Sequence, residues 1–333
     1  MNSLPYPDLG RLFMIGLPGP RLDDSTIRLI RENRISSFIL FKRNVEDPKQ
    51  LSELCTALTT TCSEKGLPKP FISIDQEGGT VTRLPPPFTQ FEDARSLANS
   101  DDPEDALNRY AATCADELLE IGINMNLAPV LDVCPSGRNL IMERRSLGQD
   151  PNKVAALGRL VIETFQEKGV AACGKHFPGL GAASLDPHFE LPIVDHSLQT
   201  LESMDLIPFQ AAINAGIAAI MTSHTIYKGL DPDTPATMSK KILTGLLRER
   251  LGFKDLIITD DLEMGAIEKN GFLEEAALTS FQAGADILLI CHDHTKVILT
   301  YKRLETALAN SEILPDRLQA SLERIERAGK RFL

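Results

Sequence analysis

Eight short apolar segments, spread over nearly the whole chain, constrain the fold more than any other feature of this sequence. Most of them are continuous apolar runs, as expected for parallel strands that are buried on both faces. They lie at residues 12–17, 37–41, 71–74, 125–130, 170–173, 218–221, 256–258 and 286–290. Each segment is therefore predicted to be a strand of one parallel sheet.

Helical patterns separate most of the predicted strands. Asp-Pro pairs at 47–48 and 150–151 open two of the helices, because an aspartate can cap a helix and a proline fits its first turn. The predicted helices span or begin at 26–33, 48, 103–119, 151, 240–251, 273–281, 295–308 and 315–333. Strand–helix alternation that recurs in this way predicts an α/β fold, a (β/α)8 barrel of the TIM type.

An open, doubly wound sheet is the alternative, since it can also hold eight parallel strands. The turn after the first predicted strand, Gly16-Leu17-Pro18-Gly19, lacks the Gly-rich pattern of a dinucleotide-binding fold. No linker or low-complexity segment divides the chain. We therefore expect one (β/α)8 domain over residues 1–333, with the last helix (about 315–333) packed on the barrel.

Composition excludes several classes of function. The net charge of −11 argues against a general nucleic-acid binder, because such proteins concentrate Lys and Arg. No run approaches the ~20 apolar residues of a membrane span, and the N-terminus fits a signal peptide poorly. The six cysteines are scattered without a C-x-x-C pair, so we expect reduced, mostly buried thiols. These features predict a soluble, cytoplasmic protein that binds neither nucleic acid nor membrane.

Ionisable residues follow the ends of the predicted strands, where a barrel keeps its active site. They occur in segments 75–83, 132–145, 175–188, 223–224, 260–264 and 292–294. The densest stretch runs from Lys175 to Pro192 and mixes two histidines and an aspartate with glycines and prolines, without a helical or strand period. We expect it to be a loop that carries chemistry.

The residue types at this rim favour glycoside hydrolysis. No serine or cysteine lies in a nucleophile-elbow sequence. A metal site is less favoured, because Asp186 and His188 on a loop lack the helical spacing of many zinc sites. Carboxylates combined with a group that shuttles protons suit the cleavage of a glycosidic bond.

Four motifs occur in the order seen in one family. They are Asp75-Gln76-Glu77-Gly78-Gly79 with Arg83, Lys175-His176-Phe177-Pro178-Gly179, Asp186-Pro187-His188 and Thr259-Asp260-Asp261-Leu262-Glu263-Met264. From about residue 10 to about residue 292, the chain resembles the single-domain bacterial β-N-acetylglucosaminidases (β-hexosaminidases) of glycoside hydrolase family 3, which act in peptidoglycan recycling.

The resemblance implies catalytic and sugar-binding roles. Asp260 matches the nucleophile that forms a covalent glycosyl-enzyme, and it is preferred to Asp261, whose side chain should face away. His188 matches the acid/base, with Asp186 as its orienting partner. The matched sugar-binding positions are Asp75, Arg83, Arg145, Lys175 and His176.

Structural interpretations stand beside these roles. Either Arg83 or Arg145 could serve only an ion pair, and Asp186 could only turn the loop. Arg145 is preferred to Arg144 because it directly precedes Ser146-Leu147-Gly148. Three histidines receive no role and are expected to be structural. They are His224, His292 and His294.

The resemblance also implies a substrate class. The family removes a non-reducing N-acetylglucosamine that is β-linked to 1,6-anhydro-N-acetylmuramic acid, so N-acetylglucosamine-containing saccharides or muropeptides are the expected partners. The oligomeric state is left open, with a monomer favoured, and no metal or cofactor is expected. Some relatives use phosphate in place of water, and the sequence leaves the acceptor and the leaving-group preference open. The other hypotheses are another exo-β-glycosidase of the family, a glycoside phosphorylase, a non-catalytic sugar-binding relative and a metal-dependent barrel hydrolase.

The sequence departs from the family pattern at three positions of the 175–192 stretch. Leu180 replaces a usual His, Ala182 a usual Asp and Pro187 a usual Ser, which puts loop dynamics and rate in question. Without ligand, we expect the part of the loop that carries His188 to be displaced from Asp260.

Overall fold

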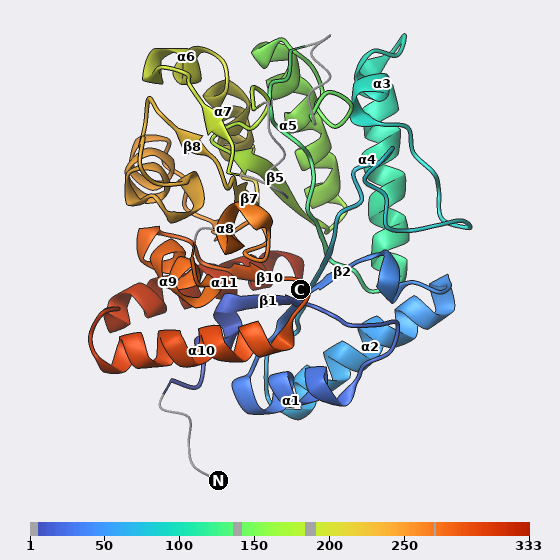
Figure 1. The fold of residues 1–333 in the computed structure, drawn as a ribbon. Helices are drawn as coiled ribbons and strands as arrows, with labels where there is room; N and C mark the ends of the chain where they lie inside the picture. The colour runs from blue at the N-terminus through green and yellow to red at the C-terminus, as the bar shows by residue number, and fades with distance from the viewer. Residues whose placement is uncertain (1–5, 136–141, 184–190, 270) are drawn as a thin grey trace.

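Eight parallel strands form the centre of the molecule (Figure 1). The computed structural model describes residues 6–135, 142–183, 191–269 and 271–333. The strands are β1 (Phe13–Gly16), β2 (Ser37–Leu40), β3 (Phe71–Ile74), β4 (Met125–Asn126), β5 (Ala171–Phe177), β7 (Ala219–Thr222), β9 (Leu256–Ile258) and β10 (Leu288–Ile290). Each of them overlaps one of the predicted segments, so the prediction of eight parallel strands is confirmed.

The pairing order describes a barrel. Hydrogen-bonded neighbours follow the order β10-β1-β2-β3-β4-β5-β7-β9. A parallel bridge between Ile258 and Ile287 then joins the end of β9 to the chain just before β10. Because the two outermost strands of the order meet, the (β/α)8 prediction is confirmed and the open-sheet alternative is wrong.

Asp-Pro pairs begin three of the outer helices. The aspartate side chain accepts a hydrogen bond from a backbone N–H of the first turn, and the proline occupies the first helical position, where its missing N–H costs no bond. These helices are α2 (Pro48–Glu64), α4 (Pro103–Glu120) and α5 (Pro151–Glu167). The others include α1 (Asp24–Asn33), α3 (Ala94–Ala98), a π-helix (Lys241–Arg250), α8 (Gly265–Glu268), α9 (Leu273–Ala283), α10 (His294–Ala309) and α11 (Pro315–Phe332).

The connection between β5 and β7 contains helices that the sequence did not predict. α6 (Leu198–Ser203) and α7 (Leu206–Asn214) lie there together with β6 (Ile193–Val194), which pairs in parallel with β8 (Ile226–Tyr227), a short strand that follows β7. Pro208 falls in the first turn of α7, where it interrupts no helical hydrogen bond. Helix α7 was not predicted because a proline usually counts against a helix, but Pro208 does not interrupt this one.

Strand β5 runs further than predicted. It continues through Phe177, so Lys175 and His176 lie on the strand and not in the loop after it. The backbone of Lys175 pairs with the segment after β4, since its carbonyl accepts the N–H of Leu131 at 2.7 Å. On the other side, the carbonyl of Phe177 accepts the N–H of Ser223 at 2.9 Å. These bonds on both sides extend the strand past its apolar part.

A cluster of charges at the amino-terminal end of the strands fastens helix α11. Asp286, which is fully buried just before β10, accepts hydrogen bonds from Ser321 Oγ at 2.6 Å and from Arg324 Nη1 at 3.0 Å. Arg248 of the π-helix binds the same carboxylate. A single buried carboxylate thus joins α11, the π-helix and the barrel.

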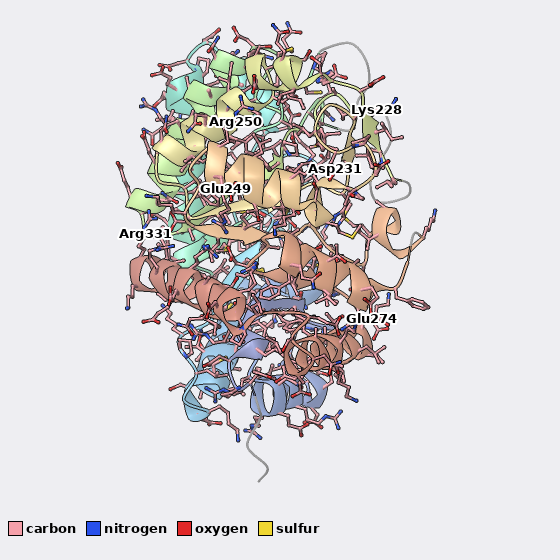
Figure 2. All side chains as sticks on the ribbon, turned by 90° about the vertical axis from the view of Figure 1, so that its left-hand side faces the viewer. Lys228, Asp231, Glu249, Arg250, Glu274 and Arg331 are labelled. Carbon is pink, nitrogen blue, oxygen red and sulfur yellow. The ribbon has the colours of Figure 1, made fainter. Side chains whose placement is uncertain are left out.

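Charged side chains of both signs are spread over the outer face of the molecule (Figure 2). Arg250 pairs with Glu202, and Lys228 pairs with Asp195 at 3.4 Å. All six cysteines are buried and free, as predicted. Within the described part of the chain, none of the helices has the length and apolar character needed to cross a membrane.

Candidate active site

A cavity of about 330 Å³ opens at the carboxyl ends of the barrel strands. Its walls come from strands or strand ends on all sides of the barrel, as expected for a fold that places its site there. The lining residues are Ile39, Phe41, Asp75, Val81, Arg83, Leu127, Arg145, Lys175, His176, Met221, Asp260, Asp261, Met264, Leu289, Cys291 and His292. Six of the predicted site residues are therefore brought together.

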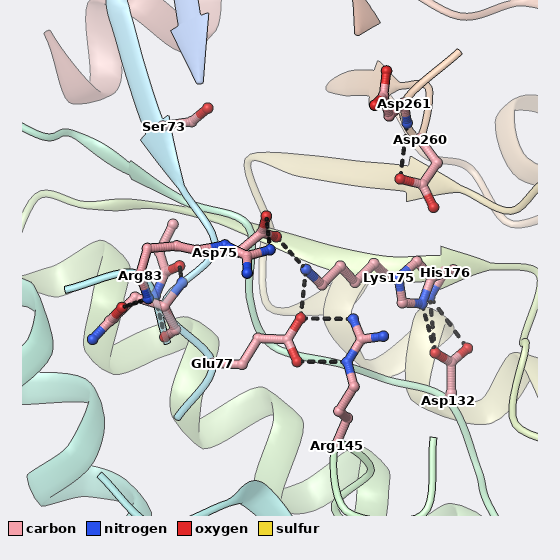
Figure 3. Close-up of polar contacts among 12 residues, drawn as sticks. Ser73, Asp75, Glu77, Arg83, Asp132, Arg145, Lys175, His176, Asp260 and Asp261 are labelled. Carbon is pink, nitrogen blue, oxygen red and sulfur yellow. Dashed lines mark hydrogen bonds and ion pairs between the residues drawn. The ribbon is translucent and has the colours of Figure 1, made fainter. Parts of the chain in front are cut away.

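A continuous chain of ion pairs lies along one side of this cavity (Figure 3). Lys175 Nζ lies 2.7 Å from Asp75 Oδ1 and 2.7 Å from Glu77 Oε1. Arg145 binds Glu77 through two N–H···O bonds of 2.8 Å each. Arg83 Nη2 lies 3.3 Å from Asp75 Oδ2. The order along the chain is therefore Arg83, Asp75, Lys175, Glu77 and Arg145.

These groups stay charged although they are buried or half-buried. Burial acts to lower the pKa of Lys175, but the carboxylates of Asp75 and Glu77 outweigh it and hold that pKa above its ordinary value. Burial acts to raise the pKa of Asp75, and the charges of Lys175 and Arg83 hold it below its ordinary value. Arg145 and Lys175 depress the pKa of Glu77 in the same way. Three cations and two carboxylates leave one net positive charge in the chain of ion pairs.

A second buried carboxylate orients His176. Asp132 is fully buried, and its Oδ2 lies 2.8 Å from Nδ1 of His176. It also accepts the backbone N–H of His176 at 3.2 Å and that of Leu180 at 2.6 Å. Because a carboxylate accepts, Nδ1 of His176 donates, and the ring is fixed in one orientation against the cavity. Asp132 thus ties the end of β5 to the chain that follows it.

Asp260 and Asp261 reach the cavity from the end of β9. Asp260 Oδ1 accepts the backbone N–H of Asp261 at 2.9 Å, and its carboxylate points toward the side where Lys175 and His176 lie (Figure 3). Asp261 is also among the residues that line the cavity. Its carboxylate points away from that of Asp260 (Figure 3) and accepts the backbone N–H of Cys291 at 3.3 Å.

The environment of Asp261 favours its protonated form. Burial raises the pKa of this carboxyl to about 7, and the charges of Glu263 and Asp260 add to the rise. Its Oδ1 accepts the backbone N–H groups of Glu263 at 3.1 Å and Cys291 at 3.3 Å. His292 Nε2 lies 3.5 Å from Oδ2. A carboxyl that changes charge near neutral pH therefore stands beside Asp260.

An aromatic ring borders the cavity near these groups. Phe41 stacks on His292 with 5.8 Å between the ring centroids. The guanidinium groups of Arg43 and Arg83 lie 4.5 and 5.6 Å from its centroid. Such cation–π contacts stabilise the orientation of the ring and hold positive charge close to an apolar surface.

The two neighbouring arginines, Arg144 and Arg145, differ in their placement. Arg145 lines the cavity, whereas Arg144 is 71% exposed and pairs with Asp93 at 3.2 Å. The bidentate bond of Arg145 to Glu77 means that its structural interpretation also applies. The structural interpretation applies to Arg83 as well, because it forms an ion pair with Asp75.

Part of the predicted site cannot be placed. Asp186, Pro187 and His188 lie outside the described residues, so the acid/base pair and the position of its loop remain predictions. Leu180 is 4% exposed, and Ala182 is half-buried. Of the histidines without a predicted role, His292 lines the cavity and His294 holds the carbonyl of Gly16 at 2.9 Å.

No role was assigned from the sequence to two residues that hold the site together, Glu77 and Asp132. Glu77 and Asp132 contact the predicted sugar-binding residues and are 5% and 0% exposed. The signal for Glu77 was a second acid two positions after Asp75, and that for Asp132 was an acid directly after an apolar run. Neither pattern shows which cation or imidazole the carboxylate will meet.

No metal centre is recognised in the described part of the chain. Groups of three or more His, Cys, Asp or Glu side chains placed to hold a metal ion are absent from residues 6–135, 142–183, 191–269 and 271–333. Asp75 of the cavity and the neighbouring Glu77 are instead paired with Lys and Arg side chains.

Comparison with known proteins gives a consistent result. Residues 8–328 match the glycosyl hydrolase family 3 N-terminal domain. The β-hexosaminidase of Nitrosomonas eutropha is 35% identical over 285 residues, which cover 84% of this chain and 80% of that protein. The β-hexosaminidase of Pseudomonas aeruginosa is 32% identical over 306 residues, covering 92% of this chain and 89% of that one.

Solved structures agree with this assignment. A family 3 β-N-acetylglucosaminidase from Paenibacillus sp. superposes with a TM-score of 0.94 at 35% identity, and this chain spans 99% of its own length but 62% of that protein. A β-N-acetylhexosaminidase from Beutenbergia cavernae superposes with a TM-score of 0.90 at 27% identity, covering 99% of both chains. The chain therefore belongs to glycosyl hydrolase family 3, a family of glycoside hydrolases.

Proposed function

We propose that the protein is a retaining exo-β-N-acetylglucosaminidase with Asp260 as its nucleophile. The observation that carries the proposal is the placement of the Asp260 carboxylate on a cavity of about 330 Å³ that Asp75, Arg83 and Lys175 also line. This volume is at the low end of the range for ligand pockets and suits one terminal sugar better than an internal stretch of polymer. The similarity to β-hexosaminidases supports N-acetylglucosamine as that sugar.

The reaction would proceed in two displacements. In the first, an oxygen of Asp260 attacks the anomeric carbon, the bond to the leaving oxygen breaks, and His188 gives that oxygen a proton. In the second, His188 takes a proton from water, the water oxygen attacks the same carbon, and Asp260 is released. The roles of His188 and of Asp186, which would orient it, rest on the family resemblance alone.

The charged chain would hold the sugar during both steps. Asp75 can accept hydrogen bonds from sugar hydroxyls, and Lys175 and Arg83 can donate to them. His176 presents one ring edge to the cavity while Asp132 holds the other. Arg145 would donate from its remaining N–H groups, because two of them already bind Glu77.

Substrate and setting form the finer part of the proposal. We infer that the natural substrates are peptidoglycan fragments with a non-reducing N-acetylglucosamine, and that the enzyme acts as a monomer without metal or cofactor. Six buried, unpaired cysteines are typical of the reducing cytoplasm, which supports a cytoplasmic location.

Kinetics on model substrates test the proposal. We expect hydrolysis of p-nitrophenyl N-acetyl-β-glucosaminide to exceed that of the β-glucoside, and Asp260→Ala to abolish it. A fluorinated N-acetylglucosaminyl fluoride should label Asp260, and mass spectrometry of peptides would locate the adduct. A label on another residue would disprove the nucleophile assignment. Product analysis with and without phosphate would show whether water or phosphate is the acceptor.

A further inference from the structure

We propose that His224 is a positioning residue, which holds the turn that carries Asp260 in the geometry that nucleophilic attack requires. The inference rests on the proposed role of Asp260 and adds a residue that acts from behind the cavity wall. Within the described part of the chain, His224 is not one of the residues that line the cavity. Its contacts nevertheless lead directly to the nucleophile.

His224 joins two neighbouring strands of the barrel. It follows β7 and is 1% exposed, and its Nε2 lies 2.9 Å from the carbonyl oxygen of Asp261, which follows β9. Because a carbonyl oxygen only accepts, Nε2 carries a proton and donates it. The same carbonyl accepts the backbone N–H of Met264 at 3.0 Å. The turn after Asp260 is thus closed locally by Met264 and fastened to the next strand by His224.

The other ring nitrogen is also satisfied. His224 Nδ1 lies 2.8 Å from the hydroxyl of Thr237, a fully buried residue. That hydroxyl can donate to Nδ1 or to the carbonyl of Ser223 at 2.9 Å, and this carbonyl already accepts the backbone N–H of Thr237 at 3.1 Å. When the hydroxyl donates to Nδ1, the carbonyl of Ser223 keeps its bond from the Thr237 N–H, and Thr222 Oγ1, 2.7 Å away, can donate to Thr237. A neutral ring protonated on Nε2 satisfies both nitrogens.

The opposite side of the same turn is held by Asp261 itself. Its Oδ1 accepts the backbone N–H of Cys291, which follows β10, at 3.3 Å. The Asp261 peptide is consequently held from β7 through its carbonyl and from β10 through its carboxylate. Since Asp260 Oδ1 accepts the N–H of Asp261 at 2.9 Å, the orientation of the nucleophile depends on where this residue is held.

Removal of the His224 bond should therefore affect the chemical step more than substrate binding. A displacement of about 1 Å at reacting groups can lower a rate by about 10²-fold. The groups proposed to bind the sugar lie on β5 or in the segments that follow β3 and β4, and His224 contacts none of them through the bonds described above. We therefore expect a His224 variant to show a lower rate of attack by Asp260 with little change in its affinity for the substrate.

The experiment measures labelling of Asp260 by a fluorinated N-acetylglucosaminyl fluoride over a range of reagent concentrations. His224→Leu should lower the maximal labelling rate by about 30- to 100-fold, with less than about a two-fold change in the half-saturating concentration. His224→Gln keeps a donor near the position of Nε2 and should recover at least part of this loss. Thr237→Val, which removes the hydroxyl at Nδ1, should cause a smaller decrease of the same kind.

His294→Leu is the matched control, because His294 also holds a strand-end carbonyl, that of Gly16 at 2.9 Å, but does not contact the Asp260 turn. It should label at the wild-type rate. If wild-type protein is not labelled on Asp260, the proposed function fails. If wild type is labelled and a folded His224→Leu or Thr237→Val variant is labelled equally fast, or if only half-saturation changes, the positioning role is wrong. Circular dichroism of each variant establishes that it is folded.

Discussion

The barrel has a buried ionic cluster at each end, and the two differ in how their hydrogen-bonding groups are used. At the amino-terminal end, Asp286 is surrounded by Arg248, Arg317 and Arg324. Arg248 also donates to the backbone carbonyls of Phe253 and Asp255. Arg317 also donates to those of Phe281 and Ala285. At the carboxyl end, the chain from Arg83 to Arg145 lines an open cavity.

The contrast separates a structural ion cluster from one suited to binding. Arg248 and Arg317 donate to several backbone carbonyls as well as to Asp286, and the cluster fastens α11 and the π-helix to the strands. The groups at the other end pair with one another and keep one net positive charge, and Asp75, Arg83 and Lys175 still face the space where a ligand would lie. Burial and pairing alone therefore do not identify a functional site, whereas an open face does.

The strongest test of this contrast removes the central cation of the carboxyl-end cluster. Lys175→Met should lower kcat/KM for p-nitrophenyl N-acetyl-β-glucosaminide by about 10³-fold, because a donor to the sugar is lost. It should also lower the free energy of unfolding by about 3–5 kcal/mol, since Asp75 and Glu77 are left partly unpaired. Steady-state kinetics and urea unfolding measure the two effects. Lys168→Met, at an exposed pair with Asp116, is the control and should change neither.

The matching change at the amino-terminal end should affect stability alone. Asp286→Asn leaves three arginines without their carboxylate and should lower the free energy of unfolding by about 3–5 kcal/mol. The kcat and KM of the folded protein should be unchanged, as measured at a temperature well below the unfolding midpoint. A ten-fold loss in kcat would show that the two ends are coupled and that the contrast does not hold.

A pH-dependent test applies to Asp261. Its pKa is raised to about 7, so the folded protein binds this proton more tightly than the unfolded chain, and the stability that this carboxyl contributes is lost as pH rises from about 4 to 7. Asp261→Asn lacks this loss. Its stability relative to wild type should therefore rise over that range by up to about 4 kcal/mol, at about 1.4 kcal/mol per pH unit. Urea unfolding at pH 5 and pH 8 measures the difference, and equal values at both would contradict the shift.

The smallest effects are expected on the outside of the molecule. Arg144→Ala removes a pair between a 71% exposed side chain and Asp93 and should change stability by less than about 0.5 kcal/mol, without effect on activity. Arg145→Ala, one position along, should lower kcat/KM by about 10²-fold because Glu77 loses its bidentate partner. Similar kinetics for the two variants would remove the basis for preferring Arg145.

The sequence predicted the strands better than the contacts between strand ends. Apolar runs such as 256–258 identify buried strands because burial on both faces demands apolar side chains at consecutive positions. Helix α7 was missed because Pro208 counts against a helix unless its place in the first turn is known. The extension of β5 through Lys175 and His176 was missed because the prediction relied on apolar residues, and these two polar side chains face the cavity instead of the apolar core.

The sequence motifs predicted which residues form the site, but they did not predict the ion pairs and hydrogen bonds between those residues. Lys175 and Asp75 were expected near one sugar, and they lie 2.7 Å apart. The bonds of Glu77 and His224 depend on partners 98 and 37 positions away, since Lys175 follows Glu77 and Asp261 follows His224 by those intervals. No local pattern encodes such distances, because the barrel closure alone brings these strand ends together.

Asp132 has a consequence for sequence variation in this family. It holds Leu180 only through the backbone N–H, so the bond is indifferent to the side chain at position 180. A leucine at this position, where the family resemblance implies a histidine, therefore keeps the link to the ring of His176. Proline is the exception, because it has no N–H to donate. Substitutions at position 180 should therefore keep the hydrogen bond to Asp132 whatever the side chain, and the volume of the buried side chain should limit which residues are accepted. Proline should be excluded because it cannot form this bond.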